Sequence, residues 1–245
     1  MHKSAKISLI FNVIIAIFVI FATIAMYTHF EFMGHATLLT EDGINMLQFY
    51  TVQSNLLMGI MAVVYAVYDV LLLQNKISKI PTGLSLLKLM FTVGVSVTLL
   101  TVVLYLTPIT GSNCAALYMN SNLFFHILVP IFAIITFLCF EKTKSIKFRY
   151  VLLCLIPTVL YGVYYVINAF THIVDGKVPY KYDWYLFAQG SIGMTIVVFS
   201  VMLIFAYLIS AALWRLNRIK VKQKQDKWCP VFLCIITKRA FVWRI

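Results

Sequence analysis

Six long apolar runs, separated by short polar breaks, constrain this chain more than any other feature of its sequence. Each run reaches the roughly 20 residues that an α-helix needs to cross a hydrocarbon core about 30 Å thick. Because lipid offers backbone groups no hydrogen-bond partner, such runs must be helical. The sequence therefore predicts an all-α polytopic membrane protein, a bundle of six transmembrane helices. The predicted spans are Ile7–Tyr27, Met46–Leu73, Leu84–Leu106, Met119–Phe140, Tyr150–Phe170 and Phe187–Leu213.

Composition agrees with this fold class and gives no sign of a separate soluble domain. Of the 245 residues, 62% are hydrophobic and 11% are charged, whereas soluble domains average roughly 45–50% and about 25%. The first run resembles a signal peptide, but it is too long and lacks a cleavage site, so it reads as an uncleaved helix. We expect a transmembrane domain over residues 1–215 and a basic cytoplasmic tail over residues 216–245 that ends in a short apolar segment.

The net charge of +12 is distributed with a regular alternation. Basic residues gather before the first run, in every second break, and after the last run. By the positive-inside rule, both termini are cytoplasmic, and the tail is expected to meet anionic lipid rather than nucleic acid. Asp69 and Lys88 lie inside runs near the cytoplasmic ends, where an ion pair or snorkelling accounts for them. The basic residues are Lys3, Lys6, Lys76, Lys79, Lys142, Lys144, Lys147, Arg149, Arg215, Arg218, Lys220, Lys222, Lys224 and Lys227.

Two of the predicted helices place polar side chains at the same depth. The second helix enters from the outside through "FYTVQSNLL", which puts Thr51, Ser54 and Asn55 in the outer half of the bilayer. The fourth also enters from the outside, and His126 follows about two turns after its start. At about 1.5 Å per residue, Thr51 and His126 both lie roughly 7–11 Å below the outer surface.

Helical periodicity gathers polar and aromatic side chains into stripes on three helices. Because polar groups in lipid are costly, such stripes face the bundle interior or a wet cavity. The sequence therefore predicts an outward-opening pocket between the second and fourth helices. The stripes are Thr51, Asn55, Met58, Ala62, Tyr65 and Asp69; Asn122, His126 and Pro130; and Tyr161, Tyr165, Asn168 and His172.

These side chains also have structural interpretations, position by position. Hydroxyls and amides in membrane helices commonly bond a backbone carbonyl or hold helices together, which applies to Thr51, Asn55 and Asn122 taken singly. His126 differs, because an ionisable side chain within a span is a functional hypothesis by default. Pro130 leaves the His126 carbonyl without its helical donor, so we expect the helix to deform there.

A threonine hydroxyl and an imidazole together suit acyl transfer or ester hydrolysis. The imidazole takes the hydroxyl proton and later returns it to the leaving group, while amide or phenol donors stabilise the oxyanion. An ester buried in a bilayer leaflet is a lipid. No acidic residue within the spans is placed to orient His126, although Asp183 could dip in from the outer loop. The predicted pocket residues are Ser54, Asn55, Asn122, Tyr161, Tyr165, Asn168 and Asp183.

At these residues the sequence resembles a known family. The blocks "FYTVQSNLL", "FFHILVPIFA" and "YGVYYVINAF…GKVPYKYDWY" look like those of the androgen-induced family of integral membrane threonine hydrolases, in order along the chain up to about residue 215. The spacing His-x-x-x-Pro fits its bacterial branch. The resemblance implies hydrolysis of fatty acid esters of hydroxy fatty acids in a bacterial cytoplasmic membrane, with catalytic roles for Thr51 and His126 and no cofactor.

Two other classes of function stay open at this point. One is a membrane metalloenzyme, since imidazoles and carboxylates suit zinc, although their spacing matches no known metal signature. The other is a non-catalytic binder or transporter of lipids or small molecules, which six helices around a pocket permit. The candidate metal ligands on the outer side are His29, Glu31, His35, His126, His172 and Asp183.

The alternation of charged breaks generates a topology prediction. A reporter fused to the C-terminus should behave as a cytoplasmic protein, because the basic breaks stay on the side of the membrane where they are made. Paired fusions of a fluorescent protein, which matures inside, and alkaline phosphatase, which is active outside, measure this. Phosphatase activity from the C-terminal fusion would overturn the assignment of sides.

Overall fold

The computed structural model describes residues 2–35, 38–41, 43–141, 146–188 and 192–218. Within these residues the regular structure is entirely helical. Six helical segments in the described part are long and apolar enough to cross a membrane, which confirms the predicted fold class. They are Lys3–Tyr27, Tyr50–Leu73, Thr82–Tyr118, Asn120–Cys139, Phe148–Thr171 and Gly193–Arg218.

The spans are built from α-helices interrupted by short 3-10 and π segments. The α-helices are α1 (His2–Tyr27), α2 (Tyr50–Leu73), α3 (Thr82–Thr101), α4 (Thr107–Thr110), α5 (Asn120–Leu123), α6 (Val129–Cys139), α7 (Ile156–Thr171) and α8 (Ile192–Arg218). The π segments are η2 (Val102–Leu106) and η4 (Phe124–Leu128). The 3-10 segments are η1 (Gly43–Gln48), η3 (Gly111–Tyr118), η5 (Phe148–Leu155) and η6 (Tyr180–Tyr182).

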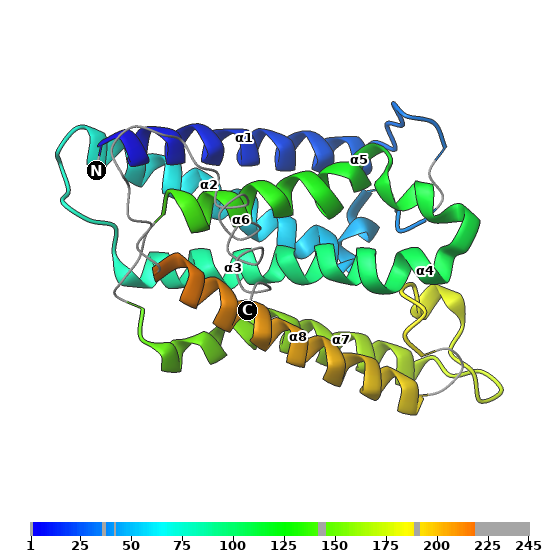
Figure 1. Cartoon of the computed structure of the whole chain (residues 1–245). Helices are drawn as coiled ribbons and strands as arrows, with labels where there is room; N and C mark the ends of the chain where they lie inside the picture. Colours follow the sequence, from blue (N-terminus) through cyan, green and yellow to red (C-terminus); the bar gives the residue numbers. More distant parts are fainter. Residues whose placement is uncertain (1, 36–37, 42, 142–145, 189–191, 219–245) are drawn as a thin grey trace, which may run out of the picture.

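The helices run side by side along one axis (Figure 1). The start of α1 lies at one end, which we call the N-terminal end. The α4 segment and the yellow loop before α8 lie at the opposite end, which we call the distal end (Figure 1). The helices α1, α2, α5 and α6 lie on one side of α3, and α7 and α8 lie on its other side. The central position of α3 explains why ten of its residues are buried.

Three of the helical interruptions come directly before a proline. Pro108, Pro130 and Pro157 stand at the starts of α4, α6 and α7, after η2, η4 and η5. Proline has no N–H, so it cannot complete the hydrogen bond to the carbonyl four residues earlier, and such helices adjust by local π or 3-10 turns. The deformation expected at Pro130 is therefore a π turn, and it contains His126.

Three predicted span boundaries are wrong. The second span is predicted to start at Met46, but Met46 lies in the 3-10 helix η1 and α2 begins at Tyr50. The third span is predicted to end at Leu106, but its helical segment continues through α4 and η3 to Tyr118.

The sixth span is predicted to start at Phe187, but α8 starts at Ile192. The N–H of Ala188 donates to the Asp183 carboxylate at 3.1 Å, which holds this apolar stretch in a turn.

The interior confirms the polar and apolar stripe that periodicity predicts along α2. All six members are at most 6% exposed, although other faces of α2 meet the surface, where Ile60 is 62% exposed. The polar members occur near both ends of the stripe and the small or apolar members lie between them. The stripe is Thr51, Asn55, Met58, Ala62, Tyr65 and Asp69.

Of the predicted basic tail, residues 216–218 continue α8 and residues 219–245 lie outside the described residues.

The helices α1 and α2 approach each other closely at Gly59. A Cβ atom on Gly59 would stand 2.6 Å from a methyl carbon of Val19. Small residues let membrane helices approach in this way, because their association rests on van der Waals packing. Gly59 therefore sets the distance between α1 and the helix that carries Thr51.

We predict that Gly59→Ala lowers the free energy of unfolding by about 1–3 kcal/mol, the usual cost of overpacking. Thermal unfolding of the purified protein in detergent measures the loss. Gly83→Ala makes the same chemical change where no atom lies within 4 Å, so it should leave stability nearly unchanged. Val19→Ala should restore part of the loss in the Gly59→Ala background, and failure to do so would show that the α1–α2 contact is not the cause.

Candidate functional site

Thr51 lies in the first turn of α2, near the distal end, and is buried. Its backbone N–H donates to the phenol oxygen of Tyr185 at 3.4 Å. Its carbonyl accepts the Ser54 hydroxyl at 3.1 Å, and Ser54 also meets the Thr98 hydroxyl at 3.2 Å. Ser54 thus joins α2 to α3, whereas Thr51 faces the loop that precedes α8.

A small cavity beside Thr51 has room for about one water molecule. Of the predicted site residues, Thr51 and Tyr161 line it, whereas His126, Asn55 and Asn122 do not. The cavity is enclosed by α2, α3, η2, α7, α8 and the loop before α8. Its lining residues are Tyr50, Thr51, Thr98, Thr101, Val102, Leu106, Tyr161, Tyr185, Phe187 and Met202.

His126 occupies the π segment η4 and has no solvent exposure. Its Nδ1 lies 2.5 Å from the carbonyl oxygen of Leu117. A carbonyl only accepts hydrogen bonds, so the neutral ring carries its proton on Nδ1 and leaves Nε2 as the acceptor. Nε2 is buried and has no hydrogen-bond partner. This tautomer gives the ring the state that a general base needs.

The side chain of Asn55 connects the segments that carry Thr51 and His126. Its Nδ2 donates to the Thr51 carbonyl at 2.7 Å and to the Phe125 carbonyl at 3.0 Å. Asn55 Oδ1 is buried without a partner. The structure shows no hydrogen bond between the Thr51 hydroxyl and His126, so the two predicted catalytic groups are brought to adjoining segments rather than into contact.

Asn122 lies one turn before His126 and binds the segment η3, which also carries Leu117. Its Nδ2 donates to the carbonyls of Leu38 and Ala116, at 2.9 and 3.2 Å. Ala116 precedes Leu117, the residue bonded to His126. Asn122 Oδ1, like His126 Nε2, is a buried acceptor that lacks a donor. These side chains position η3 against η4 and leave acceptors that a water or a hydroxyl group would satisfy.

The loop over residues 183–188, which we call the plug, covers the cavity with aromatic side chains. The Asp183 carboxylate accepts hydrogen bonds from the Tyr165 phenol and from the N–H of Ala188. The Trp184 indole N–H donates to the Tyr161 oxygen at 3.0 Å, and Tyr161 in turn donates to the Gln48 carbonyl at 2.8 Å. The plug is therefore anchored to α7 directly and, through Tyr161, to the end of η1.

Two of the remaining predictions need correction or qualification. Asp183 does not orient the imidazole, since Nδ1 of His126 bonds a carbonyl and Nε2 bonds nothing; this carboxylate anchors the plug instead. Asn168 is half-buried, its Nδ2 is a buried donor without a partner, and its carbonyl contacts His172 Nδ1 at 2.8 Å. It lies outside the lining of the Thr51 cavity.

The candidate metal ligands of the alternative interpretation are dispersed. Glu31 pairs with His35 at 2.5 Å, and His172 stacks on Tyr182 with ring centroids 3.7 Å apart. In the described ranges, no three His, Cys, Asp or Glu side chains gather in a way that could hold a metal ion. The arrangement of these residues does not support the metal site.

Sequence reasoning missed the plug residues Trp184 and Tyr185. Tyr185 contacts Thr51 and both are buried. The available signal was the aromatic density of "YDWYLF", which is unusual for a water-exposed loop. Periodicity cannot detect such residues, because the plug has no regular structure and therefore no face.

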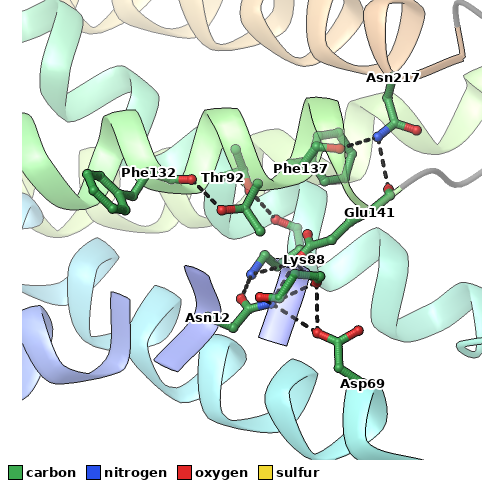
Figure 2. A network of polar contacts seen from close by, with 10 residues as sticks. Asn12, Asp69, Lys88, Thr92, Phe132, Phe137, Glu141 and Asn217 are labelled. Atoms are coloured by element: carbon green, nitrogen blue, oxygen red, sulfur yellow. Dashed lines mark hydrogen bonds and ion pairs between the residues drawn. The ribbon is translucent and has the colours of Figure 1, made fainter. Parts of the chain in front are cut away.

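Sequence reasoning also missed a second polar cluster (Figure 2). It lies in the half of the bundle next to the N-terminal end, which we call the N-terminal half. The predicted ion pair of Lys88 is present, with Glu141 as the partner at 3.3 Å. The lysine does not snorkel, because its side chain has no exposure and its ammonium also contacts Asn12 Oδ1 at 2.5 Å. Asp69 accepts from Ser8 instead, at 2.7 Å. The signal was Asn12 in the first apolar run, opposite a lysine in the third.

Comparisons of the chain with protein-family models, with curated proteins and with solved structures find no match. The residues and contacts described above therefore carry the functional interpretation.

We predict that Asp183→Ala destabilises the protein by about 2–4 kcal/mol. The Tyr165 hydroxyl and the Ala188 N–H lose their buried acceptor, and each unsatisfied group costs about 1–3 kcal/mol. Asp175→Asn removes the charge of an exposed carboxylate in the segment between α7 and α8, at a positive φ that Asn tolerates, and serves as the control. Thermal unfolding in detergent should separate the two variants; equal stability would show that the carboxylate does not anchor the plug.

Proposed function

We propose that this chain is an intramembrane lipid-ester hydrolase of a bacterial cytoplasmic membrane, in which Thr51 is the nucleophile and His126 the general base. The substrate class is a fatty acyl ester, of which a fatty acid ester of a hydroxy fatty acid is the example that the sequence resemblance implies. The observation that carries the proposal is the buried imidazole whose Nδ1 is fixed by Leu117 and whose Nε2 is an unpaired acceptor.

The reaction proceeds in two balanced steps. The Thr51 oxygen bonds to the ester carbonyl carbon while Nε2 of His126 takes the hydroxyl proton, directly or through one water. The alcohol leaves as its C–O bond breaks and receives that proton, which leaves an acyl-threonine. Water then attacks the acyl carbon, gives a proton to His126, and the fatty acid leaves as the Thr51 oxygen is reprotonated.

Tyr185 is the donor best placed for the oxyanion. Its phenol lies against Thr51, and donors held in a dry site stabilise a developing negative charge strongly. Burial raises the pKa of the Tyr185 phenol above its ordinary value near 10. A raised phenol pKa keeps the group protonated through the physiological range, so it remains a donor at neutral pH.

The active arrangement requires movement, because the cavity has room for about one water and not for an ester group. Displacement of the plug would admit the ester beside Thr51, and the gap to His126 would be closed by a water or by adjustment of the π turn. Catalytic hydrogen bonds commonly tighten only when substrate binds. A non-catalytic carrier, by contrast, is expected to present a preformed pocket of roughly 300–1,000 Å³.

A groove on the lipid-facing side offers the acyl chain a place next to the cavity. It has a volume of about 280 Å³ and lies between α7 and α8, with Val163, Ile167 and Phe199 among its apolar lining. The Thr158 hydroxyl at its wall lies 2.9 Å from the Tyr50 phenol, which also lines the Thr51 cavity. An acyl chain in this groove would bring its ester toward Thr51 from within the bilayer.

Replacement of the two catalytic groups tests the proposal. Thr51→Val and His126→Gln should each reduce ester hydrolysis by at least about 10³-fold, and the double variant should be little worse than either, because nucleophile and base act as a unit. Activity should fall as the pH is lowered, since only a neutral imidazole accepts the proton. The measurement is release of fatty acid from a hydroxy fatty acid ester by protein in detergent.

The matched control is Thr101→Val. It makes the same chemical change at another threonine that lines the cavity. It should retain activity within about tenfold. A fluorophosphonate probe should label the wild type and the Thr101→Val variant but not Thr51→Val. Labelling that persists without the Thr51 hydroxyl, in folded protein, would contradict the assignment of the nucleophile.

A further inference from the structure

The polar cluster in the N-terminal half joins four segments of the chain around one amide (Figure 2). Asn12 of α1 accepts a hydrogen bond from Lys88 of α3 through Oδ1, at 2.5 Å. Its Nδ2 contacts Glu141, which follows α6, at 2.8 Å and Asp69 of α2 at 3.4 Å. Each of these four side chains is at most 7% exposed, so the cluster is shielded from water.

The charges of the cluster do not balance. Among the described residues, two carboxylates, Asp69 and Glu141, face one ammonium group, that of Lys88, which leaves one negative charge in excess. Lys88 pairs with Glu141 at 3.3 Å, whereas the hydrogen-bond partners of Asp69 are the uncharged Ser8 and Asn12. Ionised groups that are buried without a counter-charge are strongly disfavoured.

The Glu141 carboxylate is not fully satisfied by its neighbours. Its Oε1 contacts Lys88, Asn12 and Ser8, yet its Oε2 is buried and has no hydrogen-bond partner. The described residues do not bring a third carboxylate, histidine or cysteine to this place that would help to hold a metal ion. A bound proton meets the charge condition, because it neutralises the excess negative charge and converts one carboxylate oxygen into a hydroxyl group.

Ser8 lies between the two carboxylates. Its hydroxyl is 2.7 Å from Asp69 Oδ2 and 3.4 Å from Glu141 Oε1. A hydroxyl group has one hydrogen and can donate to only one of them at a time, while its oxygen can accept from the other. A protonated Asp69 can therefore give its proton to the Ser8 oxygen as Ser8 gives its own to Glu141, a step that moves one proton and leaves Ser8 unchanged.

We infer that Asp69 and Glu141 form a binding site for a single proton, with the Ser8 hydroxyl as the relay between them and Lys88 as the fixed counter-charge. The site lies in the half of the bundle opposite to Thr51 and does not depend on ester hydrolysis. Within the described part of the chain, the titratable or charged groups that face it are Asp69 and Tyr65 from α2, Lys88 from α3, and Glu141. The helices α1 and α8 contribute the uncharged Ser8, Asn12 and Asn217.

Infrared spectroscopy of the purified protein at neutral pH tests this inference. The wild type should show the carbonyl stretch of a protonated carboxylic acid. Asp69→Asn and Glu141→Gln should each remove it, because each leaves one carboxylate for one ammonium. Lys88→Met should increase the band about twofold, since both carboxyl groups then need a proton. Asp175→Asn, at an exposed position, should leave the spectrum unchanged.

Thermal unfolding provides the second readout and checks that the variants fold. Asp69→Asn should keep the Tm within about 2 °C of the wild type, or raise it, because the amide replaces a neutral acid. If that variant does not fold, the growth of the band in Lys88→Met decides the question. A band that survives in both Asp69→Asn and Glu141→Gln, or one that does not grow in Lys88→Met, would overturn the inference.

Discussion

The contact between the Lys88 ammonium and the Asn12 amide oxygen is the interaction on which the arrangement of the first helices depends. Lys88 lies in the second turn of α3 and has no exposure, so it must meet its partners inside the bundle. In lipid an unmatched ammonium or amide costs several kcal/mol, and this cost fixes which faces of α1, α2 and α3 can meet. The approach of α1 to α2 at Gly59 lies between this cluster and Thr51, so the same rigid pair of helices positions both polar regions.

The fold was largely predictable from the sequence because lipid enforces simple rules. Each run of about 20 apolar residues became a helix, and the stripe from Thr51 to Asp69 faces inward, since periodicity and the cost of exposed polar groups specify both. The breaks were predictable only in part. Pro130 marked the position of a deformation, but the choice of a π turn depends on how the freed carbonyls are satisfied by neighbours.

The candidate site was less predictable, because its last components come from a segment without periodicity. Depth and face were sufficient to single out Thr51, Asn55 and His126 but not to say what each touches. Tyr185 reaches Thr51 from the plug, and Leu117 reaches His126 from a 3-10 segment. Both contacts join residues whose relation in the sequence carries no pattern, and they arise from tertiary packing alone.

The two halves of the bundle handle buried polarity in different ways, and this difference bears on how they can work. In the distal half the polar side chains that link Thr51 to His126 are uncharged amides, hydroxyls and the neutral imidazole, and several acceptors have no donor, namely Asn55 Oδ1, Asn122 Oδ1 and His126 Nε2. Neutral groups cost less to rearrange than paired charges, so this half can open to admit a substrate. In the N-terminal half the ion pair of Lys88 and Glu141 ties α3 to the end of α6. Separating that pair would leave two uncompensated charges in the interior, so the N-terminal half resists opening. Any movement that exposes Thr51 is therefore expected to pivot about the charged cluster, with the plug and the distal turns of the helices as the moving parts.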